Sequence, residues 1–145
     1  MNIRALIEVK EATIMKTRSN YSIILILFSL LFGAAAALGQ SGKWTKKTNS
    51  INGTWSISES GGKKVLSLKG FKTANAPDLK IFLSPKTASA VSSKNATQGS
   101  VLVAKLKSNK GDQKYTLPAN VDLSKYKSVV IHCEKYSKLW GAGKL

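Results

Sequence analysis

The two most reactive side chains of this 145-residue chain stand next to each other, because His132 and Cys133 are its only histidine and its only cysteine. A histidine that takes the proton of a cysteine produces the thiolate nucleophile of many hydrolases. Residues 128–136 are rich in β-branched side chains and predict a strand. Successive side chains of a strand point to opposite faces, so Cys133 would share one face with Val129 and Ile131, while His132 would lie on the other. Adjacency in the sequence therefore argues against a Cys–His dyad.

Two interpretations of Cys133 stay open at this point. A free cysteine in apolar company packs like a small hydrophobic residue, which favours a buried and inert thiol. A redox-active thiol needs a lowered pKa and access to its reaction partner. Lys135, two residues further along the predicted strand, is the candidate cation that would lower the pKa. If the thiol is redox-active, access is expected beside residues 139–145, where Gly141 and Gly143 offer little side-chain cover. His132 is expected to be an exposed strand residue.

The carboxylates give no sign of acid–base catalysis. Beyond residue 39 no two of them are spaced as an acid and base pair, and there is no nucleophile-elbow motif and no glycine-rich phosphate loop. One histidine and one cysteine cannot fill a structural zinc site, which needs four ligands, so no metal site is predicted. The five acids concerned are Glu59, Asp78, Asp112, Asp122 and Glu134.

The first 39 residues predict a secretory signal peptide, with translation starting at Met15. Lys16 and Arg18 precede an apolar run, and small residues at 35–39 fit the rule for cleavage. The apolar run of 16 residues, 23–38, is shorter than the roughly 20 residues that a membrane-spanning helix needs. We therefore predict an exported domain over residues 40–145, periplasmic or extracellular. It would be membrane-anchored if the signal segment is not cleaved.

The expected mature domain is strongly basic. The chain has 23 basic and 7 acidic residues, of which 19 and 5 lie beyond residue 39, and this leaves a net charge of +14. All 19 are lysines, although the planar fork of arginine is preferred for reading phosphates and base edges. The lysines are scattered from Lys43 to Lys144. They predict a solvated surface that keeps a small domain monomeric and attracts anionic surfaces weakly, without specific nucleic-acid binding.

Short apolar patterns separated by turn residues predict an all-β fold, either a small antiparallel β-sandwich or a partly open barrel. Two glycines at 61–62 suit a tight hairpin turn. Gly111 is the expected positive-φ position of a turn at 108–112, and Asp122 should begin one helical turn. Residues 85–99 are polar and small and predict a long loop. Strands are expected over residues 53–60, 64–71, 77–84, 100–107, 113–118 and 128–136.

Three segments occur in an order and spacing that resembles the DM13 domain family over residues 44–145: "APDLKIFLS", "LKSNKGDQKYTLP" and "YKSVVIHCEKYSKLWGAGKL". The most specific part is the terminal pattern, in which an apolar run is followed by a cysteine, an aromatic residue, a second aromatic residue and small residues. Two departures are His132, where the family often has an aromatic residue, and Trp140, where it often has phenylalanine. The positions that carry the pattern are Pro77, Asp78, Gly111, Tyr115, Pro118, Cys133, Tyr136, Trp140, Gly141, Ala142 and Leu145.

The resemblance implies an electron-transfer role on extracellular or surface proteins. It implies that Cys133 is redox-active, either as a bare thiol or as the ligand of a group such as haem, and that the redox partner is a separate protein. It favours a redox accessory module over a stand-alone enzyme. The residues by themselves leave an alternative, a non-catalytic β-sandwich interaction domain in which Cys133 is core packing and the lysines meet an acidic partner.

Overall fold

The computed structural model describes residues 39–145, so the predicted signal segment lies outside the described part apart from its last residue. Among these residues no helix has the length and apolar character that crossing a membrane requires. The elements are β1 (Gln40–Lys43), β2 (Thr45–Lys46), β3 (Ile51–Ser60), β4 (Lys63–Thr73), β5 (Leu79–Ser84), β6 (Val101–Lys105), β7 (Lys110–Thr116), the 3₁₀ turn η1 (Leu123–Lys125), β8 (Ser128–Cys133) and β9 (Lys138–Lys144).

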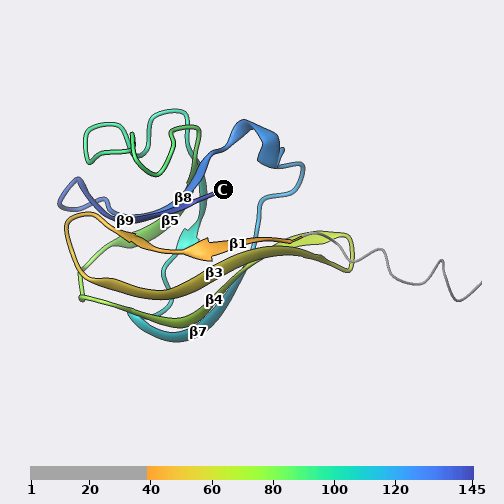
Figure 1. Cartoon of the computed structure of the whole chain (residues 1–145), viewed down its shortest axis with the longest axis horizontal. Helices are drawn as coiled ribbons and strands as arrows, with labels where there is room; N and C mark the ends of the chain where they lie inside the picture. Colours follow the sequence, from red (N-terminus) through yellow and green to blue (C-terminus); the bar gives the residue numbers. More distant parts are fainter. Residues whose placement is uncertain (1–38) are drawn as a thin grey trace, which may run out of the picture. The chain divides into compact units, whose positions relative to one another are not determined.

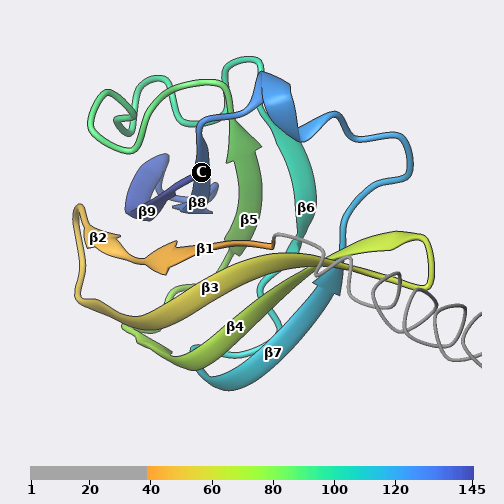
Figure 2. The ribbon, with the colours of Figure 1, turned by 45° about the vertical axis from the view of Figure 1, so that its right-hand side comes forward.

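The strands form two antiparallel sheets that are not closed into a barrel, which confirms the all-β prediction of a sandwich or a partly open barrel (Figures 1 and 2). The first sheet has the order β1-β3-β4-β7 and the second β2-β9-β8-β5-β6. The chain crosses from the first sheet to the second at Trp44, between β1 and β2. These two short strands were not predicted, because residues 40–46 show no alternation of apolar and polar side chains. The strands are defined by their pairing with β3 and β9.

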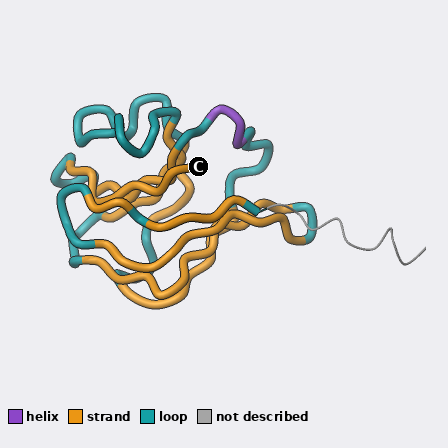
Figure 3. Tube along the Cα trace, in the orientation of Figure 1, coloured by secondary structure: helices purple, strands orange, loops and turns teal. Residues whose placement is uncertain are grey.

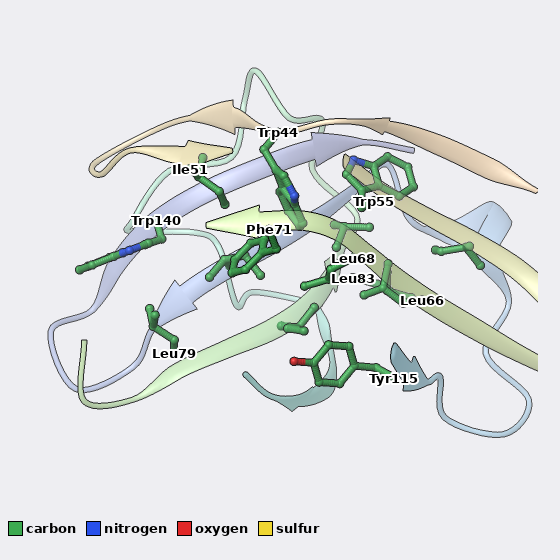
Figure 4. Close-up of a cluster of buried hydrophobic side chains, with 14 of the residues drawn as sticks. Trp44, Ile51, Trp55, Leu66, Leu68, Phe71, Leu79, Leu83, Tyr115 and Trp140 are labelled. Carbon is green, nitrogen blue, oxygen red and sulfur yellow. The ribbon is translucent and has the colours of Figure 1, made fainter. Parts of the chain in front are cut away.

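Alternating apolar residues point between the sheets and form the main core, as the sequence predicts for four strands (Figure 4). Burying one such side chain contributes about 1.5–3 kcal/mol, so this set dominates the stability of the domain. The predicted inward-facing residues are all buried: Trp55 and Ile57 on β3, Leu66 and Leu68 on β4, Leu79, Ile81 and Leu83 on β5, and Val129, Ile131 and Cys133 on β8.

The predicted turn chemistry is found at three places. Gly61 and Gly62 both have positive φ, 57° and 72°, as a two-residue hairpin loop between β3 and β4 requires. Asp122 caps η1 by accepting a hydrogen bond from the Ser124 backbone N–H. Gly111 has the predicted positive φ of 92°, but it lies inside β7, across from an irregularity of β4, rather than in a turn.

The second sheet is covered on its outer face by the loop of residues 85–99, drawn in green in Figure 1 and teal in Figure 3. This loop has no strand or helix, as predicted. It buries Ala88, Val91 and Ala96 in a second, smaller apolar cluster. The sheet contributes Phe82, Val130, Leu139 and Ala142 to the same cluster. The domain thus has a core between the sheets and a second core under the loop.

Candidate functional site

Cys133 is the last residue of β8 and faces the core between the two sheets. It pairs with Leu79 on β5 and Lys138 on β9, and its exposed fraction is 0%. It belongs to the same buried cluster as Val129 and Ile131, so the predicted face is confirmed. The thiol is therefore at a strand end, one residue from an exposed turn, but has no contact with solvent.

His132 lies on the opposite face of β8, as predicted, but it is buried rather than exposed. Only 4% of it is accessible, and its Nδ1 has no hydrogen-bond partner. The ring packs edge-on against Phe82, with ring centres 6.3 Å apart. The exposed-histidine prediction is wrong because the loop of residues 85–99 folds over this face. The sheet itself separates the imidazole from Sγ, which excludes a Cys–His dyad.

Burial also sets the charge state of His132. Removing the imidazolium from water lowers the pKa of His132 below its usual 6.5, while the nearby Glu134 carboxylate and the Ser93 carbonyl act in the opposite direction. Loss of solvation is the largest of these effects. The histidine is therefore neutral at pH 7 and is unsuited to stabilise a thiolate by its charge.

Lys135 does not share a strand face with Cys133. Strand β8 ends at Cys133, and residues 134–137 form a turn that is closed by a hydrogen bond from the Ser137 N–H to the Glu134 carbonyl, 3.1 Å long. Ser137 has a positive φ of 50°, which a strand would not contain. The alternation rule therefore stops at Cys133, and the prediction that Lys135 shares the face of Cys133 is wrong because Lys135 is exposed on the turn.

The glycines of β9 are not an opening in the cover of the core. A Cβ atom built on Gly141 would lie 2.8 Å from Cδ1 of Ile51, and one built on Gly143 would overlap Nε1 of Trp55. Large side chains from the first sheet thus fill the space that the glycines leave. The predicted access route beside residues 139–145 is wrong, since the missing side chains permit closer packing instead of exposure.

A charged cluster lies just outside Cys133 and fixes the turn that follows it. The Lys80 ammonium donates to the Glu134 carboxylate and lies 3.6 Å from Oδ2 of Asp78. The Glu134 N–H donates to the Asp78 carbonyl over 3.1 Å. The hydrogen bond to Glu134, more than any other contact, raises the pKa of Lys80. Asp78, named from the family pattern, therefore anchors the chain directly after the cysteine.

Sequence reasoning missed Lys80 in this cluster. Its side chain alternates with Leu79 and Ile81, which marks it as facing away from the main core. The missing information is register, because Lys80 pairs directly with His132 on β8. Opposite charges on neighbouring predicted strands are the signal that could have suggested the ion pair with Glu134.

The remaining family positions fall into two groups. Tyr136 is 54% exposed on the turn after Cys133, and Trp140 lies on β9 within the core cluster that contains the cysteine. Gly111 and Tyr115 lie on β7 of the first sheet. The Tyr115 hydroxyl accepts from the Lys107 N–H and donates to Gln113, so this group holds the connection from β6 to β7 rather than the cysteine.

The described residues do not fit a haem ligated by Cys133. Sγ is enclosed by packed side chains, and His132 points to the other side of the sheet, so the two residues cannot share one iron. Within residues 39–145 no three histidine, cysteine or acidic residues gather as a metal site. Cys133 is a free and buried thiol.

The fold and the cysteine thus define a small two-sheet β domain with one thiol at a strand end. A family model described as "Electron transfer DM13" matches residues 43–145, which is most of the chain, and the protein belongs to the DM13 family. No curated protein and no solved structure matches the chain significantly. The resemblance inferred from the terminal cysteine pattern is confirmed.

Proposed function

We propose that this DM13 protein is an exported electron-transfer module whose redox group is the bare thiol of Cys133. Family membership supports the electron-transfer role, and the tripartite pattern before residue 40 supports export. The observation that carries the choice of residue is the position of Cys133 at the end of β8, directly before an exposed turn. It is the only thiol in the chain.

The chemistry open to a single thiol is exchange with a disulfide of a separate protein. The Cys133 thiolate forms a bond to one sulfur of that disulfide, the S–S bond breaks, and the other sulfur leaves as a thiolate with the electron pair. A thiolate of a second protein, one that carries a dithiol, then attacks the Cys133 sulfur of the mixed disulfide, and the first partner leaves fully reduced. The other thiolate of the dithiol closes its own disulfide and releases Cys133 as a thiolate. Two electrons thus pass from the dithiol to the disulfide, and no metal or haem is required.

Exchange requires that the turn of residues 134–137 opens, because Sγ is fully buried in the closed state. The turn is held by the Lys80–Glu134 ion pair and by the hydrogen bond from the Glu134 N–H to Asp78. These contacts are at the surface, where opening costs less than unfolding the core. Loosening the charged cluster should therefore raise the reactivity of the thiol.

The test is the rate of alkylation of the folded protein across pH, measured by mass spectrometry. Glu134→Gln should speed labelling of Cys133 several-fold with little change in the unfolding midpoint. Glu59→Gln, which removes an exposed acid from β3, is the matched control and should leave the rate unchanged. Cys133→Ser should abolish both labelling and mixed-disulfide formation with a disulfide-bearing partner protein.

The second candidate is a non-catalytic interaction domain in which Cys133 is core packing. The complete burial of the thiol favours it. Under this function, labelling would occur only on global unfolding, at the same rate in the Glu134→Gln and Glu59→Gln variants. Cys133→Ser would then change only the stability.

Export has its own test. Mass spectrometry of protein recovered outside the cytoplasm should find a chain that begins near Leu38 or Gln40. An intact N-terminus in the membrane fraction would show that the apolar segment is an anchor.

A further inference from the structure

A concave surface lies where β9 ends, far along β8 from the cysteine. Its volume is about 520 Å³, and the residues that bound it come from four separate parts of the chain. In Figure 2 the green loop of residues 85–99 passes above the marked C-terminus, with β2 nearby. The lining residues with polar or terminal groups are Thr45, Thr87, Ser89, Lys127, Lys144 and Leu145.

Backbone pairing fixes the walls of this cavity. Thr45 on β2 pairs with Ala142, and Lys144 pairs with Ser128. The Leu145 N–H donates to the Lys127 carbonyl over 3.0 Å, so the segments that carry the two lysines lie side by side.

The loop of residues 85–99 forms another wall of the cavity and is tied to the strands by its own contacts. The hydroxyls of Thr87 and Ser89 lie 3.0 Å apart, and Nζ of Lys47 donates to the Ser89 carbonyl at 3.4 Å. Lys47 thereby adds a third ammonium group beside the cavity.

The positive charge here is not neutralised by any acidic side chain of the described residues. The ion pairs of residues 39–145 use Asp78, Asp112, Asp122 and Glu134, and none involves Lys127 or Lys144. The fifth acid, Glu59, lines a different cavity. The cavity therefore combines the exposed Lys127 and Lys144 with three hydroxyl side chains, of which those of Thr87 and Ser89 are hydrogen-bonded to each other.

We propose that this cavity binds a sugar that carries a phosphate or sulfate group, such as one unit of an anionic glycan. Lys127 and Lys144 would hold the anionic group as point charges. Thr45, Thr87 and Ser89 would pair with sugar hydroxyls. The volume exceeds that of a single water in the liquid, about 30 Å³, by an order of magnitude, which leaves room for a sugar ring. No aromatic side chain lines the cavity, so it lacks the stacking platform that nucleobases require.

The experiment is a titration of the ¹⁵N-labelled protein, followed by NMR at physiological salt, with glucose 6-phosphate, glucose 6-sulfate and glucose. Either anionic sugar should shift the amides of Thr45, Thr87, Ser89 and Lys144 in a saturable manner. Glucose should shift them at least tenfold more weakly. A preference between the two anionic sugars tells which group the site takes.

Charge-matched variants separate a site from diffuse attraction. The double variant Lys127→Gln/Lys144→Gln should weaken binding at least tenfold. The double variant Lys72→Gln/Lys110→Gln removes an exposed cross-strand lysine pair of the first sheet and should change affinity less than twofold. Equal losses in both variants, or shifts spread over the lysines of both sheets, would overturn the proposal. This outcome is independent of the reactivity of Cys133.

Discussion

The two faces of β8 are both buried, but by different kinds of structure. The face that carries Cys133 and Ile131 packs against the first sheet, whose strands are tied together by backbone hydrogen bonds and carry tryptophan, phenylalanine and leucine. The face that carries His132 and Val130 packs against an irregular loop that contributes small side chains. Burial by a sheet involves many cooperative contacts, whereas a loop with few apolar contacts opens at lower free energy. The cysteine and the histidine therefore have similar exposure but should differ in accessibility over time.

The largest effect is expected where the two sheets meet most closely. Gly143→Ala would place a Cβ atom on the indole of Trp55, which is itself fully buried and cannot move without disturbing the core. We expect a loss of at least about 4 kcal/mol in unfolding free energy, or no folded protein. Chemical denaturation measures it, with Ser58→Ala on the exposed side of β3 as the control. A loss below about 1 kcal/mol would show that the sheets are not packed so closely.

Truncations on the two faces compare the two cores directly. Ile131→Ala on the sheet side should destabilise the domain by about 2–5 kcal/mol, since a fully buried side chain leaves a cavity between rigid strands. Val91→Ala on the loop side should cost roughly 2 kcal/mol or less. Hydrogen exchange should show loop amides opening faster in Val91→Ala without a change in β8. Equal global destabilisation by both variants would mean that loop and sheets form one cooperative unit.

The pH dependence of stability should come from the loop side. Burial lowers the folded-state pKa of His132, so the unfolded chain binds the proton more readily. The stability contributed by neutral His132 is fully present above about pH 6.5 and is lost as pH falls below that value toward the folded pKa, at up to about 1.4 kcal/mol per pH unit.

His132 is the only histidine, so its imidazole resonance reports this titration alone. His132→Phe should flatten the stability curve between pH 6.5 and the folded pKa. An unchanged slope in the Phe variant would assign the pH dependence to the carboxylates.

The smallest effect is expected at Lys135. Its side chain lies on the exposed turn rather than on the face of Cys133. Lys135→Met should leave both the rate and the pH profile of thiol alkylation unchanged, whereas Glu134→Gln should raise the rate. A shift of the profile toward higher pH would restore the electrostatic role that the alternation rule assigned to this lysine.

Local chemistry in the sequence was sufficient for much of the fold. The alternation of Trp55 with Ile57 and of Leu79 with Ile81 predicted which faces are buried, and the structure confirms both. The paired glycines of the β3–β4 hairpin and the cap at Asp122 were also predicted correctly. These features depend on neighbours within a few residues, and a single sequence contains that information. The strands β1 and β2 were missed because partners far along the chain define them.

The sequence by itself determined the family, through the residues around Cys133, and the face of β8 that the cysteine occupies. Only the tertiary structure decided how each face is covered. It buried His132 under a distant loop, placed Trp55 and Ile51 against the glycines of β9, and ended β8 before Lys135. It also brought lysines that are scattered in the sequence to one cavity, where Lys127 and Lys144 lie without an acidic side chain. The first two outcomes and the cavity depend on contacts between residues far apart in the sequence, and the end of β8 depends on its register with β9. The local pattern of side chains contains neither kind of information.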